Sequence, residues 1–280
     1  MIRHYLSIVI PILLAALLVS SCQTPPLPGS PENAQVLLLG ETHDNGEGHR
    51  LRADELRDRI EAGWRPAIAM EQFDREQQPA LDGAMRECTD ADCVVKRLVP
   101  GKSGWNWAFY KPVIALAMQY KLPLLAANLS RADAGKVIKG GIASVLDAAT
   151  VSRYGLDKSL PAIVLRPQIE EVSTGHCGML PEAMLEPMAR AQIARDVMMA
   201  DTLRPFASRG AVLIAGNGHV RGDIAVPYWL HTQGLTTLSI GFVEQPGAAG
   251  GFDQERRIAV IERPDPCVGL GKKIGDKPGR

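Results

Sequence analysis

Two short apolar runs, each followed by a glycine and a histidine, constrain the fold of this chain most strongly. Val36–Leu39 leads into Gly40-Glu41-Thr42-His43, and Val212–Ala215 leads into Gly216-Asn217-Gly218-His219. Runs without polar alternation are typical of parallel strands that are buried on both faces. A histidine just past such a strand has its backbone held by the sheet and its side chain free to reach a ligand. The two turns therefore predict one shared site if the strands lie side by side.

Further strands and helices alternate along the chain. Apolar runs predict strands over residues 66–71, 122–128 and 236–243, and apolar residues at helical spacing predict helices over 50–62, 76–86, 110–120 and 224–232. Residues 256–261 suggest a last strand at an edge of the sheet, with an antiparallel direction left open. This alternation predicts an α/β fold with a mostly parallel sheet flanked by helices.

The middle of the chain has a different character. Residues 130–209 contain several helical patterns, including a long helix expected over 192–206, and their best strand candidate is the short run 163–165. We therefore predict a smaller helical insert or cap at 130–209. The α/β core domain is then formed by 34–129 and 210–280.

The N-terminal segment has the features of an export signal. Residues 1–21 are basic and then apolar and are interrupted by Pro11. Their last residues form, with Cys22, the sequence Val19-Ser20-Ser21-Cys22, a pattern that resembles a bacterial lipobox. An ordinary signal peptide with an incidental cysteine is the alternative. Residues 22–33 would then be a lipidated cysteine and a proline-rich tether. Gln23 gives no reason for retention in the inner membrane, so we expect an anchor in the outer membrane, facing the periplasm.

The charge balance and the cysteine content give further indications of the partners and of the disulfides. Acidic and basic residues balance at 31 each, so no strong field points to nucleic acid as a partner. Five cysteines become four if Cys22 is acylated. In an oxidising compartment we predict the disulfides Cys88–Cys93 and Cys177–Cys267. A metal-binding thiol pair is the alternative for the first, but a second close cysteine pair to complete a zinc site is missing.

Polar residues follow four of the predicted strands. Because ligands bind beyond the carboxyl ends of strands in open α/β sheets, these residues should share one rim. The main candidates are Glu41, His43, Glu71 and His219. Imidazole and carboxylate groups there can ligate a divalent metal, act as general acid and base, or form a structural hydrogen-bonded network.

Other candidates lie outside this rim. Residues 103–112 concentrate aromatic side chains, which suit a planar ligand or anchor a helix in the core, and Tyr110 there offers a phenolate to ferric iron. His49 lies in or near the first helix. His176, beside Cys177 in the insert, either reaches the pocket or is an ordinary loop residue.

Taken together, these stretches resemble the ChaN-like haem-binding lipoproteins, whose superfamily also includes TIKI proteases, TraB proteins and erythromycin esterases. The stretches that carry the resemblance span most of the mature chain: Leu38-Leu39-Gly40-Glu41-Thr42-His43-Asp44-Asn45, Met70-Glu71-Gln72-Phe73-Asp74-Arg75-Glu76-Gln77-Gln78, Ala126-Ala127-Asn128-Leu129, His176-Cys177-Gly178-Met179-Leu180-Pro181 and Ala215-Gly216-Asn217-Gly218-His219-Val220-Arg221.

The resemblance implies haem binding linked to iron uptake or storage, with haem held by a tyrosine at a dimer interface. Tyr110, Tyr154 and Tyr228 are the candidate ligands, and His176 is a further cofactor-binding candidate. The expected partners are haem, outer-membrane lipid through acylated Cys22, an outer-membrane haem receptor and a second copy of the chain. In the esterase and protease relatives the matching rim carries catalysis or metal. A hydrolase that uses Glu41, His43, Glu71 and His219 is therefore the alternative function.

Overall fold

The computed structural model describes residues 34–101, 103–245 and 251–268. Its strands are β1 (Val36–Leu39), β2 (Ala67–Asp74), β3 (Leu124–Asn128), β4 (Ala211–Ile214), β5 (Thr237–Val243) and β6 (Gln254–Arg257). Its helices are α1 (Gly46–Glu61), α2 (Gln78–Glu87), α3 (Ala91–Leu98), α4 (Lys111–Gln119), α5 (Arg131–Gly140), α6 (Ala148–Arg153), α7 (Ala162–Gly175), α8 (Glu182–Leu203) and α9 (Val226–His231). The predicted signal peptide and Cys22 lie outside the described residues.

The strands form one parallel sheet in the order β3-β2-β4-β1-β5-β6. This confirms the predicted α/β fold. The edge strand β6 pairs parallel with β5, so the antiparallel alternative left open for the last strand is wrong. The run 163–165 lies inside helix α7 rather than in a strand. Within that run Val164 is buried whereas Ile163 is exposed, and Val164 recurs at helical spacing with the buried Gln168 and Val172.

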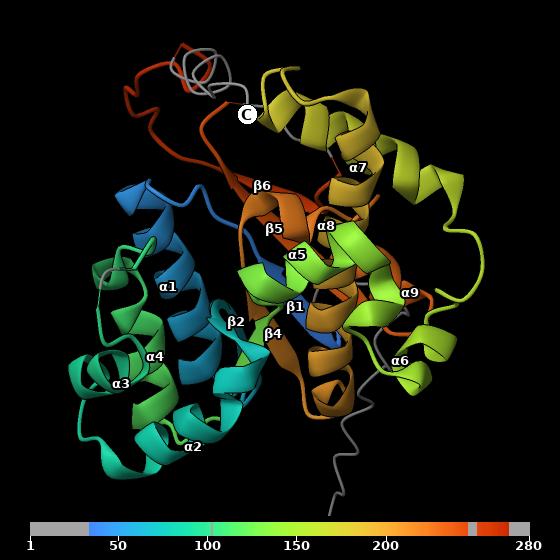
Figure 1. The fold of residues 1–280 in the computed structure, drawn as a ribbon. Helices are drawn as coiled ribbons and strands as arrows, with labels where there is room; N and C mark the ends of the chain where they lie inside the picture. The colour runs from blue at the N-terminus through green and yellow to red at the C-terminus, as the bar shows by residue number, and fades with distance from the viewer. Residues whose placement is uncertain (1–33, 102, 246–250, 269–280) are drawn as a thin grey trace, which may run out of the picture.

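Helices cover both faces of the sheet (Figure 1). Successive strand residues point to opposite faces, so Leu37 and Leu39 pack with α1, α2 and α4, whereas Val36 and Leu38 pack with α5, α8 and α9. Residues 130–209 are helical, as the sequence indicates, and α5 and α8 share this second apolar cluster with the strands. They therefore form a layer of the sandwich as well as one wall of the site described below.

The strand order brings the two glycine–histidine turns together. β1 and β4 are direct neighbours at the centre of the sheet, with Leu39 opposite Ile214. The chain leaves β1 toward β2 and β3, and it leaves β4 toward β5. Such a change of direction between neighbouring parallel strands opens a crevice beyond their carboxyl ends. His43 and His219 both follow the strands that border this crevice.

Both predicted disulfides are present. Cys88 and Cys93 are joined with their Cα atoms 5.6 Å apart, and Cys177 and Cys267 with theirs 5.7 Å apart. The residues between the first pair are not only a polar loop, because α3 begins at Ala91 with Asp90 as its N-cap. The second disulfide joins the turn between α7 and α8 to the segment that follows β6.

Candidate functional site

The first glycine–histidine turn is built around a buried carboxylate. Glu41 is 2% exposed, and it accepts hydrogen bonds from His43 Nδ1 at 2.8 Å and from the Tyr110 hydroxyl at 2.5 Å. Its second oxygen pairs with the guanidinium of Arg52, which is fully buried on α1. Burial lowers the pKa of Arg52 to about 10, so this side chain stays cationic at neutral pH. The arginine therefore compensates the charge that Glu41 carries into the interior.

His49 completes this cluster in a neutral form. Its Nε2 donates to the backbone oxygen of His43 at 3.0 Å, and its Nδ1 accepts from Arg52 at 2.9 Å. Burial, the largest cause, lowers the pKa of His49, which agrees with the tautomer that these two bonds require. His49 thus faces inward from the first helix, and its role is to hold the His43 turn and Arg52 in place.

The second turn places its histidine between two carboxylates. His219 donates through Nδ1 to Asp196 at 2.6 Å, and its Nε2 lies 3.6 Å from Glu71 Oε1. Burial raises the pKa of Asp196 to about 6 despite the opposing effect of His219. Burial also disfavours the charged imidazole, but the charges of Glu71 and Asp196 outweigh it and raise the pKa of His219. The pair is therefore arranged to hold and release a proton near neutral pH.

Two glycines allow the turns to approach each other. A Cβ atom at Gly216 would lie 2.8 Å from His43 Cε1, and one at Gly40 would lie 2.1 Å from Asn217 Oδ1. Both distances are shorter than side chains tolerate. The amide hydrogen of Gly216 also donates to Glu71 Oε2 at 2.8 Å. The rim residues predicted from sequence, Glu41, His43, Glu71 and His219, thus lie around this contact between the turns.

The rim is divided into two hydrogen-bonded groups rather than one set of metal ligands. Glu41 is occupied by Arg52, Tyr110 and His43, whereas His219 is bound to Asp196. Within residues 34–101, 103–245 and 251–268, no group of three or more His, Cys, Asp or Glu side chains is placed to hold a metal ion. The expectation of a divalent metal at these residues is therefore not supported, and acid–base chemistry remains open.

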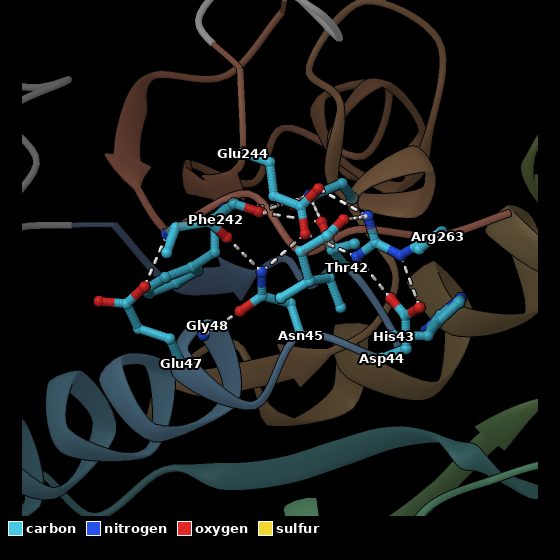
Figure 2. A network of polar contacts seen from close by, with 12 residues as sticks. Thr42, His43, Asp44, Asn45, Glu47, Gly48, Phe242, Glu244 and Arg263 are labelled. Carbon is cyan, nitrogen blue, oxygen red and sulfur yellow. Dashed lines mark hydrogen bonds and ion pairs between the residues drawn. The ribbon is translucent and has the colours of Figure 1, made fainter. Parts of the chain in front are cut away.

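A segment beyond β6 holds the first turn from outside (Figure 2). Arg263 contacts both oxygens of Asp44, at 2.6 and 2.8 Å, and both oxygens of Glu244, at 2.7 and 2.6 Å. Asn45 donates to Glu244 at 2.6 Å and to the backbone oxygen of Ala259 at 2.7 Å, and its own oxygen caps α1. The hydrogen bonds from Arg263, the largest cause, lower the pKa of Asp44. The sequence patterns did not predict this clamp.

Three adjoining hollows run along the rim. The largest, about 710 Å³, lies beside His43, Trp105 and Phe109 and reaches Arg131 and Arg195. The second, about 370 Å³, begins at the same two arginines and ends at His176. The third, about 210 Å³, shares His176 and continues to His219. Because neighbouring hollows share lining residues, they form one groove across the carboxyl edge of the sheet.

The aromatic segment contributes to both the core and the groove. Trp105 lines the largest hollow and meets the His43 ring edge-on, with ring centroids 5.0 Å apart. Trp107 instead packs against Phe73 and Tyr110 in the core. The sequence did not decide between a role in ligand binding and a role in the core. In the structure Trp105 borders the groove and Trp107 packs in the core.

The tyrosines predicted from the resemblance lie away from the groove. Tyr110 is buried against Glu41, Tyr154 is buried beside Trp229, and Tyr228 packs on the other side of Trp229. None of the three lines a hollow of the groove. The described residues therefore bring His43, Glu41, Glu71, His219 and His176 to one edge of the sheet, whereas the tyrosines remain outside it.

Comparison with known proteins identifies the family. A family described as "Haem-binding uptake, Tiki superfamily, ChaN" matches residues 30–230 of the 280-residue chain, which is more than half of it. This chain belongs to the ChaN family. The resemblance drawn from the sequence motifs is thereby confirmed. All the residues that line the three hollows fall within the matched range, whereas Arg263 and Cys267 lie beyond it.

One solved structure agrees with this fold. The ChaN protein of Campylobacter jejuni, described with cofacial haem binding, is 22% identical and has a TM-score of 0.61, over 75% of this chain and 82% of that one. The erythromycin esterase EreC in its open conformation is 14% identical with a TM-score of 0.42, over 79% and 75%. No curated protein matches the sequence. The Campylobacter protein supports the ChaN fold of this chain.

Proposed function

We propose that this protein binds haem in the groove at the carboxyl edge of its sheet and serves iron uptake or storage. The observation that carries the proposal is the groove itself, since it lies wholly within the residues that match a haem-binding family. Two of its hollows, of about 370 and 710 Å³, are in the size range of small-molecule and cofactor sites. Imidazole, guanidinium and aromatic groups line it, and these suit the iron, the carboxylates and the flat face of a haem.

Tyrosine ligation within a single copy of the chain fits poorly. A tyrosine binds ferric haem as phenolate, but burial raises the pKa of both Tyr110 and Tyr154 far above the usual value. Tyr110 is in addition held by Glu41. Tyr228 is only partly buried and is the remaining tyrosine candidate, and a haem-dependent dimer is part of the proposal.

The test is a titration of the purified full chain with haemin in mild detergent. We expect a saturable shift of the Soret band, with a growing dimer fraction in sedimentation as haemin is added. The heat-unfolded chain at the same concentration is the control for haemin that adheres without a site. A spectrum equal to that of free haemin in both samples would overturn the proposal.

The cellular location is proposed from the lipobox-like sequence. Acylation of Cys22 would hold the chain at the outer membrane, facing the periplasm, where an outer-membrane haem receptor is the expected source of the ligand. Replacing Cys22 with Ser should move the protein from the membrane to the soluble periplasmic fraction and abolish labelling by radioactive palmitate. Unchanged fractionation and labelling would refute the anchor. Within the described residues no helix is long and apolar enough to cross a bilayer.

A hydrolase is the second candidate, and the Asp196–His219 pair favours it. A histidine that lines the groove and is oriented by a buried carboxylate, with its other nitrogen 3.6 Å from Glu71, is arranged for general acid–base catalysis. His43, with Glu41 behind it, offers a second such group. A screen of ester and peptide substrates should compare wild type with His219→Gln and His43→Ala. Turnover that both variants retain in full would exclude this rim as its site.

A further inference from the structure

The turn between α7 and α8 is weakly attached to the rest of the protein. This turn and the start of α8 form residues 176–188, which we call the tip. None of these residues, all of which the structure describes, is buried, and the buried residues of α8 begin at Ala189. Within the described chain, the hydrogen bonds and ion pairs of the tip all stay inside α7, α8 and the turn. Pro187 also removes one helical hydrogen bond near the start of α8.

A disulfide joins the tip to a segment from the far end of the chain. Residues 258–268, which we call the strap, follow β6, and Cys267 near their end is bonded to Cys177 in the tip. The other end of the strap is anchored at the first glycine–histidine turn. Ile258 is buried there, and Arg263 contacts two carboxylates of that region (Figure 2). The strap therefore connects the tip to the first turn.

The tip is also part of the groove wall. His176 lines the hollows of about 210 and 370 Å³, and Met188 lines the second of them. The largest hollow lies at the other end of the groove, beside His43. Because the tip has no buried residue of its own to fix it, the disulfide and the strap are the strongest link between this wall and that end of the groove.

The backbone at Cys177 suits the disulfide better than it suits the turn. Cys177 follows His176, the residue that ends α7, and has a φ of 58°. This is the left-handed region, which residues other than glycine adopt rarely, and helices commonly end with a glycine at this position. A cysteine is less favourable than glycine here, so its bond to Cys267 is the feature that distinguishes it.

The two disulfides differ in how easily a reductant can reach them. Cys267 is exposed, as are all of residues 262–268, and Cys177 is half-buried. Cys88, by contrast, is 9% exposed and belongs to the apolar core. Reduction of a disulfide requires a thiolate to attack one of its sulfur atoms. The Cys177–Cys267 bond is therefore open to attack in the folded protein, whereas the Cys88 side of the other bond is covered.

We propose that the Cys177–Cys267 disulfide is a releasable catch on the groove. While the bond is intact, the strap holds the tip in place as a wall. When a dithiol reduces the bond, the tip moves away and the groove opens. The strap lies beyond residues 30–230, which match the ChaN family, so the catch is not part of what the family match describes.

The reduction step balances with a dithiol as the only co-reactant. One thiolate of the dithiol attacks Cys267 Sγ, the bond between the two cysteines breaks, and Cys177 leaves as a thiolate that takes up a proton. The second sulfur of the dithiol then displaces Cys267, which also ends as a thiol. Two electrons and two protons pass to the protein, and the dithiol is oxidised to its own disulfide.

The first test is selective reduction of the folded full chain. Samples are treated with increasing dithiothreitol, free thiols are trapped with iodoacetamide, and the labelled peptides are read by mass spectrometry. We expect labelling of Cys177 and Cys267 at a dithiothreitol concentration about tenfold lower than that needed for Cys88 and Cys93. Labelling of both pairs together, or of Cys88 and Cys93 first, would overturn the proposal.

The second test opens the catch without a reductant. Cys177→Gly combined with Cys267→Ser removes the disulfide and puts at the turn the residue that its backbone favours. The protease Glu-C should then cut after Glu182, in the tip, about tenfold faster than in wild type, because cleavage follows the open population. Hydrogen exchange of residues 176–188 should rise as well, while that of β1 and β4 stays unchanged and shows that the fold is intact.

Two controls accompany this variant. Cys88→Ser combined with Cys93→Ser removes the other disulfide and should leave the cut after Glu182 unchanged. Wild type that has been selectively reduced should behave like the Cys177→Gly double variant, which keeps the test valid if that variant folds poorly. Equal cleavage and exchange in oxidised and reduced wild type would overturn the catch.

The third test asks whether the catch controls the groove, and it rests on the proposed haem function. Haemin is the probe, followed by stopped-flow absorbance. It should both enter and leave the Cys177→Gly double variant about tenfold faster than wild type, because the wall no longer has to open first. Unchanged rates in a variant with an opened tip would overturn control of the groove. If wild type binds no haemin, the proposed function is wrong, while the reduction and protease tests still decide the catch.

Discussion

The two glycine–histidine turns resemble each other in sequence but differ in environment. The His43 side chain is 52% exposed beside Trp105, and its carboxylate, Glu41, is neutralised from behind by Arg52. The His219 side chain is 12% exposed, and it lies between Asp196 and Glu71 without a paired arginine. The same pattern of strand, glycine and histidine thus gives an open, charge-compensated turn in one place and a buried, proton-holding turn in the other.

The histidine itself therefore does not decide the chemistry of such a turn; the charged groups around it do. After β1, the guanidinium of Arg52 on α1 compensates the charge of Glu41, so the His43 imidazole can contact a ligand. After β4, the imidazole of His219 lies between the carboxylates of Asp196 and Glu71. Its protonation therefore affects the stability of the fold. Four predictions test this contrast, in order of decreasing expected effect.

Removing the buried arginine of the first turn should have the largest effect. Arg52→Met leaves Glu41 charged and unpaired in the interior, which should lower the free energy of unfolding by about 3–5 kcal/mol. The matched control is Arg50→Met on the same helix, where an exposed pair with Asp54 at 2.9 Å should cost less than about 1 kcal/mol. Urea denaturation of both variants measures this, and equal losses would show that burial of the pair is unimportant.

Removing the phenol that supports Glu41 should have a smaller effect. Tyr110→Phe deletes the 2.5 Å hydrogen bond to the buried carboxylate and should cost about 1–3 kcal/mol. Tyr228→Phe, half-buried and without a hydrogen bond from its hydroxyl among the described residues, should change stability by less than about 0.5 kcal/mol. Thermal and urea unfolding give both values. A Tyr110→Phe variant as stable as wild type would mean that solvent replaces the phenol.

The second turn should make stability depend on pH. The folded pKa of His219 is raised, so its stabilising contribution is complete below the unfolded value of 6.5 and is lost as pH rises through the higher folded value. The pKa of Asp196 is raised to about 6, so its contribution to stability has the same sign. This contribution is complete below the unfolded pKa of 3.8 and is lost as the pH rises to about 6. The free energy of unfolding of wild type should therefore fall as pH rises.

The variant that tests this removes both groups at once. Replacing Asp196 with Asn and His219 with Gln together should flatten the fall in stability above about pH 6, measured by urea denaturation at a series of pH values. The double variant is needed because a lone Asp196, buried without its cation, would titrate in the same range. A slope equal to that of wild type would show that this pair does not carry the dependence.

Changing the exposed histidine should have the smallest effect on the fold. His43→Gln keeps a donor toward Glu41 on a half-exposed side chain, so the free energy of unfolding should change by less than about 0.5 kcal/mol. A loss above about 1.5 kcal/mol would show that His43, like His219, is part of the folded core. The comparison between the two turns would then be wrong.

Much of the fold could be predicted from short-range patterns. The continuous apolar runs located the central strands, and the alternation with helical segments indicated a parallel α/β sheet. The rim residues followed from this, because polar residues after parallel strands lie at one edge. The two disulfides were predicted from the cysteine count and the expected oxidising compartment. The same patterns could also have indicated two further site residues. Arg52 lies on the buried stripe of α1 with His49 and Leu56, and Asp196 lies among buried apolar residues of α8.

The local hydrophobic pattern and the chain direction thus set where the strands end and which polar groups project from them. The partners of these polar groups depend on how the helices and the sheet pack. Glu41 meets Tyr110 from 69 residues away, and Asp196 reaches His219 across 23 residues, because helices on opposite faces of the sheet deliver them to its edge. The hollow lined by α5 and α8 likewise exists only once the helices are packed. Contacts between distant segments depend on packing geometry, which no local pattern encodes.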